Sequence, residues 1–192
     1  KHKESPRRAD ALYNLALAME NLQQYRSSAR EYLRYCDLFA ERDDAPEVCF
    51  RAGKVYKKMG DLKKVVSTYE NFIRRYRDNK LHGDRVVDAH LQIAKAYGDL
   101  KKERKQKEYY EKTLAAFESN KSEKSAPYGA EAKFQLMEED FENFKKIEIK
   151  GNTKEQQKGI TDKAEGLKEV EGKYKEILRF KQIYWTLASL FR

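Results

Sequence analysis

The sequence repeats a pattern of small, large and aromatic residues three times, at a spacing close to 40 residues. In each copy a small residue lies three positions before a large one, and an aromatic residue follows 13 positions after the large one. The copies contain Ala16, Met19 and Tyr32, then Gly53, Tyr56 and Tyr69, and finally Ala94, Tyr97 and Tyr110. They are offset by 37 and then by 41 residues. Such a period predicts an array of similar supersecondary units rather than one globular core.

Each unit is predicted to be a pair of antiparallel helices, a first helix A and a second helix B. The chain has only 3 Pro and 9 Gly, and 38% of its residues are charged, which is typical of helical proteins. The small residue of helix A allows helix B to approach closely. The tight turn between the helices is clearest at Gly60, because glycine readily adopts the left-handed conformation that ends a helix.

Helix-start signals recur at the same interval as the aromatic pattern. A capping residue before proline occurs at Ser5-Pro6 and again before Pro46 and Pro127, and Gly83-Asp84 precedes another apolar stretch. Together these signals divide the chain into units over about residues 6–43, 44–82 and 83–120. They predict an all-α protein in which the units form a single solenoid over residues 1–192.

The second unit resembles a tetratricopeptide repeat. The residues that carry the resemblance are Ala52, Gly53, Tyr56, Gly60, Asp61, Leu62, Val65, Tyr69 and Phe72. The resemblance covers residues 9–117 and implies a right-handed α-solenoid that scaffolds other proteins and is not an enzyme. The family's proline at the end of helix B is missing, and Val65 and Gln106 replace its small residue in helix B.

The long units, and a helix B that ends in Phe72-Ile-Arg-Arg-Tyr76, resemble a bacterial cell-envelope branch of the family. That branch contains the Tol–Pal coordinators, the lipoprotein of the β-barrel assembly machinery and gliding-motility repeat proteins. The resemblance implies a periplasmic or cell-envelope location, with the cytoplasm as the alternative. No apolar run approaches the roughly 20 residues that a membrane-spanning helix requires.

The pattern loosens after Glu118. Residues 118–125 form a polar linker, and residues 126–178 form an irregular unit whose long second helix is capped by Thr153 with Gln156. This helix carries an apolar stripe that we expect to pack along one side of the solenoid. The stripe contains Ile160, Ala164, Leu167, Val170, Tyr174, Ile177 and Leu178. Residues 181–192 are predicted to begin a further unit that is truncated here, so we expect the natural chain to continue past Arg192.

The resemblance implies that helix A side chains line a concave groove that binds a peptide or a segment of a partner protein. The predicted binding residues are Tyr13, Asn14, Leu17, Asn21, Phe50, Arg51, Lys54, Lys57, Gln92 and Lys95, with Leu91 beside them. Their mixture of cations, amides and aromatic rings favours an acidic or C-terminal segment. The two-carboxylate clamp of chaperone-binding relatives is absent, since Tyr13, Leu17, Arg51, Asp88 and Gln92 occupy its positions.

The net charge of +9 comes from the middle of the chain. Residues 51–107 contain 17 basic and 7 acidic side chains, whereas the flanking parts are nearly neutral. A solubilising outer surface explains most of these cations. Binding of RNA or another nucleic acid by this basic region is the alternative function, although the repeated aromatic or base-reading side chains expected of RNA readers are not seen.

The sequence predicts no catalytic residues, no metal ligands and no cofactor. Its three histidines are scattered, and it contains neither a metal-binding histidine motif nor a glycine-rich phosphate loop. Cys36 and Cys49 fall at the end of one helix B and the start of the next helix A. A disulfide between them is geometrically conceivable, but buried unpaired thiols are the expected state.

Overall fold

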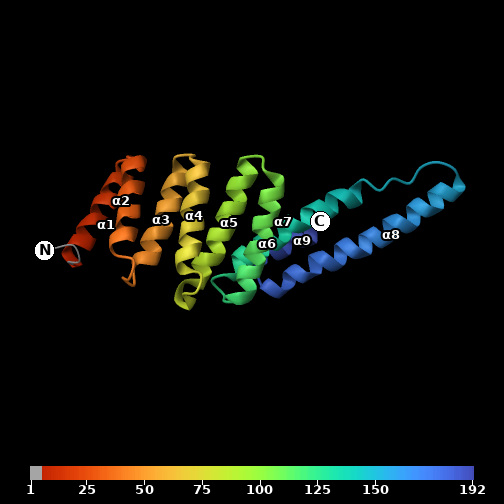
Figure 1. The fold of residues 1–192 in the computed structure, drawn as a ribbon. Helices are drawn as coiled ribbons and strands as arrows, with labels where there is room; N and C mark the ends of the chain where they lie inside the picture. Colours follow the sequence, from red (N-terminus) through yellow and green to blue (C-terminus); the bar gives the residue numbers. More distant parts are fainter. Residues whose placement is uncertain (1–5) are drawn as a thin grey trace. The chain divides into compact units, whose positions relative to one another are not determined.

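The computed structural model describes residues 6–192, and every regular element in that range is a helix (Figure 1). The α-helices are α1 (Pro6–Asn21), α2 (Tyr25–Leu38), α3 (Ala45–Lys58), α4 (Leu62–Tyr76), α5 (Gly83–Asp99), α6 (Glu103–Ser119), α7 (Ala126–Lys145), α8 (Thr153–Lys175) and α9 (Ile183–Phe191). Two short 3₁₀ helices are η1 (Lys80–His82) and η2 (Glu176–Phe180). The predicted all-α class is confirmed. No helix within residues 6–192 is both long and apolar enough to span a membrane.

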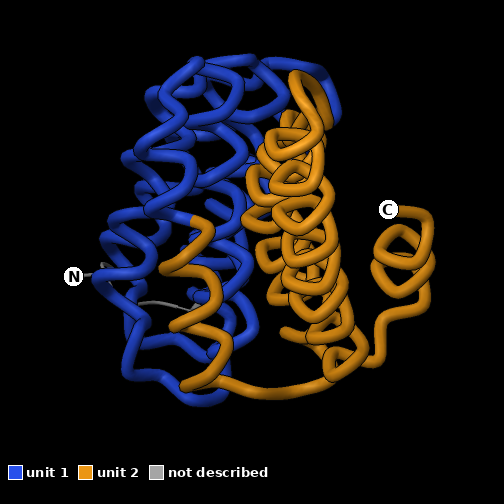
Figure 2. Tube along the Cα trace, turned by 90° about the vertical axis from the view of Figure 1, so that its right-hand side faces the viewer, with its two compact units in different colours: residues 1–109 blue, residues 110–192 orange. Residues whose placement is uncertain are grey.

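The chain divides into two compact units, residues 1–109 and 110–192, with the boundary inside α6 (Figure 2). Unit 1 contains the helix pairs α1/α2 and α3/α4, followed by α5 and the start of α6. Helix starts predicted at Ala45 and Gly83 are confirmed, while Ser5 lies outside the described residues. The single solenoid over residues 1–192 stays a prediction.

The two helices of the pairs α1/α2 and α3/α4 approach closely at a small residue of the first helix. Tyr69 of α4 is fully buried against Gly53 of α3, where any Cβ atom would collide with the tyrosine ring. Its ring centroid lies 4.9 Å from that of Phe50. In the first pair Ala16 and Tyr32 are likewise fully buried, and the Ser28 hydroxyl donates a hydrogen bond to the Ala16 carbonyl at 2.8 Å. The predicted role of the small residue in helix A is therefore confirmed in both pairs.

The turns between helices A and B share one backbone conformation although their sequences differ. Gln23, Gly60 and Lys101 have φ values of 58°, 70° and 57°, all in the left-handed region. These residues are separated by the same 37 and 41 positions as the aromatic pattern. Only one of the three is glycine, so two turns accept the steric cost that a Cβ atom brings there.

A disulfide joins Cys36 at the end of α2 to Cys49 in α3, with Cα atoms 5.6 Å apart. The expectation of unpaired thiols is therefore wrong. The packing of α3 against α2 brings together two cysteines that lie 13 positions apart, and sequence spacing alone does not reveal that distance. Closing a loop of this length typically stabilises a fold by about 3 kcal/mol.

Unit 2 is built around the pair α7 and α8, with α9 packed beside them. Its core contains Phe134, Met137, Val170, Tyr174 and Ile177, and Phe141, Phe144, Trp185 and Ala188 pack against it. The Tyr174 hydroxyl donates a hydrogen bond to Glu138 at 2.7 Å. The predicted helices over the irregular unit and over residues 181–192 are thus present.

Two predictions about α8 are wrong in detail. Asn152, rather than Thr153, caps this helix, and it exchanges hydrogen bonds with Glu155 in a capping box. Ile160, Leu167 and Leu178 of the predicted stripe are exposed, and the buried part of the stripe packs against α7. In the N-terminal half of α8 the predicted stripe is not buried. There Gly159 and Gly166 contact the segment from Phe144 to Ile149, whereas Ile160 and Leu167 next to them are exposed.

The shared turn geometry predicts that Lys101→Gly stabilises the protein. Removing the Cβ atom relieves about 1–2 kcal/mol of steric cost in the left-handed region. Glycine loses about 0.5–1 kcal/mol more backbone entropy on folding, so the expected net gain is about 0.5–1 kcal/mol. Urea unfolding followed by circular dichroism measures it. Gly60→Lys is the matched reverse change, because that site is open, and it should destabilise; a destabilised Lys101→Gly protein would contradict the argument.

Candidate partner-binding groove

A hollow of about 520 Å³ opens on unit 1, bordered by residues of α1 and α3. Its lining residues are Tyr13, Glu20, Asp44, Glu47, Val48, Phe50, Arg51, Lys54 and Lys58. The lining combines an apolar floor with three acidic and three basic side chains. Four positions of α3, residues 47, 51, 54 and 58, follow the spacing that places side chains on one helical face.

The structure brings together four of the ten predicted binding residues in this hollow, namely Tyr13, Phe50, Arg51 and Lys54. Of the other six, Asn14 and Asn21 are exposed on α1, Leu17 and Lys95 are half-buried, and Lys57 and Gln92 contact each other. None of these six is among its lining residues within the described part of the chain. Sequence reasoning missed Glu20, Asp44, Glu47, Val48 and Lys58. The one-face spacing along α3 was the available signal for Glu47 and Lys58.

Glu20 is the electrostatic centre of the hollow. Its buried carboxylate accepts hydrogen bonds at 2.7 Å from both Arg51 Nε and Lys58 Nζ, and a third at 3.1 Å from the Tyr32 hydroxyl. Burial raises the pKa of Glu20, but the bonds from the arginine and the lysine outweigh burial and hold this pKa below its ordinary value. Glu20 therefore stays ionised and ties α1 to α2 and α3.

The other two carboxylates of the hollow are engaged as well. Asp44 accepts hydrogen bonds from the Tyr35 hydroxyl at 2.7 Å and from Arg42 Nε at 3.0 Å. The hydrogen bond from Arg42 lowers the pKa of Asp44, burial raises it, and the bond from the Tyr35 hydroxyl lowers it. The net effect holds this pKa below its ordinary value. Glu47 accepts a 2.6 Å bond from Arg85 of α5. Each of the three carboxylates in the lining is therefore paired with an arginine or a lysine of the chain itself.

Lys54 is the cation of the hollow whose charge is not compensated. Within residues 6–192 it has no carboxylate at ion-pair distance, whereas Arg51 and Lys58 share Glu20. Its Nζ atom lies 5.3 Å from the ring centroid of Phe50, a residue that is buried in the floor. Lys54 is exposed, so a partner can reach its ammonium group beside the aromatic ring.

The space between α3 and α5 is crossed by side-chain bridges instead. Lys57 Nζ donates to Gln92 Oε1 at 2.9 Å, and Gln92 Nε2 donates to Asp88 at 2.8 Å. Asp88 is buried at one of the positions that the chaperone-binding clamp would use. These amide and ammonium groups already have partners, so the α1/α3 hollow is the more accessible part of the predicted groove.

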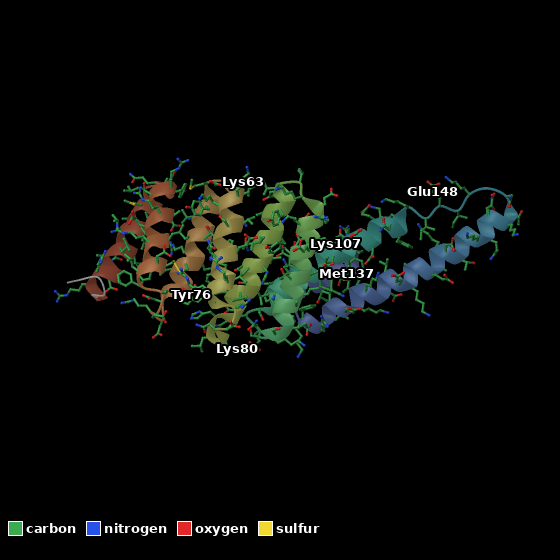
Figure 3. All side chains as sticks on the ribbon, viewed as in Figure 1. Lys63, Tyr76, Lys80, Lys107, Met137 and Glu148 are labelled. Carbon is green, nitrogen blue, oxygen red and sulfur yellow. A yellow bond between two sulfur atoms is a disulfide. The ribbon has the colours of Figure 1, made fainter. Side chains whose placement is uncertain are left out.

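Cations of unit 1 outside the hollow occur at different places on the unit. Lys63 and Lys80 lie toward opposite ends of α4, as Figure 3 shows. Arg75 is held by the Cys36 carbonyl at 2.5 Å and by Asp37 at 3.2 Å. Part of the basic excess of residues 51–107 is therefore held in ion pairs. Among the described residues, no group of three or more His, Cys, Asp or Glu could hold a metal ion.

The tetratricopeptide repeat family model matches residues 46–79 and 87–120 of the chain. Among solved structures, the chain is similar to a Podospora anserina protein described as a kinesin light chain with nearly identical TPR-like repeats. The two are 13% identical, the match covers 97% of each chain, and the TM-score is 0.47. No curated protein is significantly similar in sequence.

The contacts of Glu20 predict that Glu20→Gln destabilises the protein by about 1–3 kcal/mol near neutral pH. Because the folded-state pKa is lowered, this contribution is present above the ordinary carboxyl pKa and is lost as the pH falls through the folded value. The difference in unfolding free energy between the two proteins should therefore shrink in acid.

Denaturant unfolding at a series of pH values measures this difference. Glu31→Gln is the matched control, because Glu31 is equally buried but pairs only with exposed arginines of its own helix. A larger loss for the control than for Glu20→Gln would contradict the assignment.

Proposed function

We propose that this chain is a scaffold of protein–protein interaction and that it binds a segment of a partner protein in the α1/α3 hollow of unit 1; the match of two stretches to the tetratricopeptide repeat model supports this proposal. The observation that carries the proposal is Lys54, the uncompensated cation held over the ring of Phe50. The hollow offers room for side chains, and its carboxylates are neutralised by arginines and lysines of the chain itself.

The chemistry of the lining favours an acidic segment with a neighbouring apolar side chain. A carboxylate can pair with Lys54, while an aliphatic or aromatic group can pack against Val48, Phe50 and Tyr13 in the floor. Arg51 contributes less free charge than the sequence suggests, because Glu20 already neutralises it. Of the cations predicted to line the groove, Lys54 beside the Phe50 ring is therefore the one that we propose to contact the partner.

The proposal predicts that Lys54→Glu weakens binding of an acidic segment about tenfold or more, because an attraction is replaced by repulsion in a partly desolvated hollow. A phage-displayed library of random peptides, selected on the unmodified protein, supplies the probes. We expect enrichment of peptides that combine Asp or Glu with an apolar neighbour. Fluorescence polarisation of the selected peptides then compares the variants.

Lys63→Glu is the matched control, since it makes the same change on an exposed lysine outside the hollow. Arg51→Glu is unsuitable, because it would bring a second carboxylate against buried Glu20. Equal binding by the Lys54→Glu protein would remove this hollow from the site. Absence of selected peptides, together with tight, steeply salt-dependent binding of an RNA homopolymer, would favour the nucleic-acid alternative.

The Cys36–Cys49 disulfide supports a further part of the proposal, an oxidising compartment such as the periplasm or cell envelope. In that compartment the two cysteines should be bonded in the cell, because no reducing thiol pool acts on them. Alkylation of free thiols in intact source cells, followed by mass spectrometry, tests this expectation. Recovery of both cysteines in the alkylated form would instead support the cytoplasm.

A further inference from the structure

A second hollow of unit 1, of about 430 Å³, is bordered by α2 and α4, the second helices of the first two pairs. Both of these helices pack on α3, which contributes Cys49 to the lining. The α1/α3 hollow takes none of its described lining residues from α2 or α4, so the two hollows are separate. A volume of this size falls within the range of about 300–1,000 Å³ that is usual for small-molecule sites.

The floor of this α2/α4 hollow is apolar. The Cys36–Cys49 disulfide, the buried ring of Phe72 and the half-buried side chain of Leu33 contribute to it. Tyr76, labelled in Figure 3, continues the floor. Its ring centroid lies 5.0 Å from that of Phe72, and its hydroxyl lies 3.4 Å from Cys49 Sγ. A surface of sulfur, aromatic and aliphatic groups favours contact with a hydrocarbon body.

One hydroxyl in the lining lacks a hydrogen-bond partner although its residue is buried. Thr68 is 6% exposed, and no hydrogen bond joins its hydroxyl to another residue within residues 6–192. A threonine inside a helix often donates to the carbonyl four positions earlier, but here the Lys64 carbonyl accepts its side-chain bond from Ser67, at 3.2 Å. Because an unpaired buried hydroxyl costs free energy, a ligand oxygen that accepts a bond from Thr68 is stabilised there.

The exposed rim of the hollow carries an arginine whose charge is not compensated. Arg75 is held by the Cys36 carbonyl and by Asp37, the one carboxylate among the described lining residues. Arg74 has no carboxylate at ion-pair distance in the described chain. Its Nη2 atom donates a hydrogen bond to Asn71 Oδ1 at 2.8 Å, which orients the guanidinium group. The remaining N–H groups of an oriented guanidinium suit a carboxylate.

We propose that the α2/α4 hollow binds a small free carboxylic acid with an apolar body, such as a medium-chain fatty acid. One carboxylate oxygen pairs with Arg74, the other accepts a hydrogen bond from Thr68, and the hydrocarbon packs on the disulfide and Phe72. Every described lining residue lies within a helix, where backbone amides are already bonded. Recognition therefore rests on side chains, which favours a free acid over the C-terminus of a protein, whose carboxylate is usually captured by free backbone amides.

Isothermal titration of the whole 192-residue chain with octanoate tests the proposal, without a reducing agent so that the disulfide stays intact. We expect saturable binding of one molecule. Octanamide has the same hydrocarbon body without the charge, and it should bind at least tenfold more weakly. Butyrate keeps the charge but has a shorter body, so it should also bind more weakly than octanoate.

Two substitutions test the roles of the polar groups. Arg74→Gln should weaken octanoate binding about tenfold and leave octanamide binding unchanged. Thr68→Val should weaken octanoate binding about fivefold. It should not lower the free energy of unfolding in urea, because this hydroxyl makes no hydrogen bond within the described chain. A merely structural role for Thr68 would lower that free energy.

Arg104→Gln is the matched control, since it makes the same change at an exposed arginine outside the hollow. Lys54→Glu should also leave octanoate binding unchanged, because Lys54 belongs to the α1/α3 hollow. The proposal is overturned if octanoate does not bind, if octanamide binds equally well, or if Arg74→Gln has no effect. Loss of binding in the Lys54→Glu protein would place the acid in the other hollow and overturn it too. So would a peptide with an apolar C-terminal residue that displaces octanoate and binds more tightly.

Discussion

The close packing of Tyr69 of α4 against Gly53 of α3 sets how the central helix pair of unit 1 fits together. Tyr69 occupies the volume that any side chain at Gly53 would need, so the two helices meet at a fixed position along their length. The turn residues Gln23 and Gly60 then recur at matching places, because each pair is held in the same register. A regular position for helix A is what aligns the side chains of α1 and α3 around one hollow.

Within that hollow, ion pairing decides which charges face a partner. A basic sequence suggests a surface that attracts anions, yet Arg51 and Lys58 are held by buried Glu20, and Arg85 by Glu47. These ion pairs join α1 to α3 and α3 to α5, so they stabilise the packing of neighbouring helix pairs. Lys54 is the cation of the hollow without a carboxylate partner among the described residues, and we propose that it contacts the partner protein. Net charge is therefore a poor guide to recognition in a repeat protein whose ion pairs join neighbouring helices.

Unit 2 is also held together by burial of apolar side chains between helices, but its last helix is only partly covered. Its long helices α7 and α8 share a core of aromatic and aliphatic residues. Gly159 and Gly166 of α8 allow the last residues of α7 and the loop after them to approach α8 closely. Helix α9 repeats the spacing of a helix A but has only one covered side.

The sequence by itself determined the helix pairs, the close approach at Gly53 and four of the residues in the hollow, because these depend on local periodicity and side-chain size. Only the tertiary structure decided the Cys36–Cys49 bond, the capture of Arg51 by Glu20 and the left-handed turns at Gln23 and Lys101. It also showed that Ile160 and Leu167 are exposed. These features depend on how helices meet, and a small rotation of one helix changes which side chains touch without altering the spacing in the sequence.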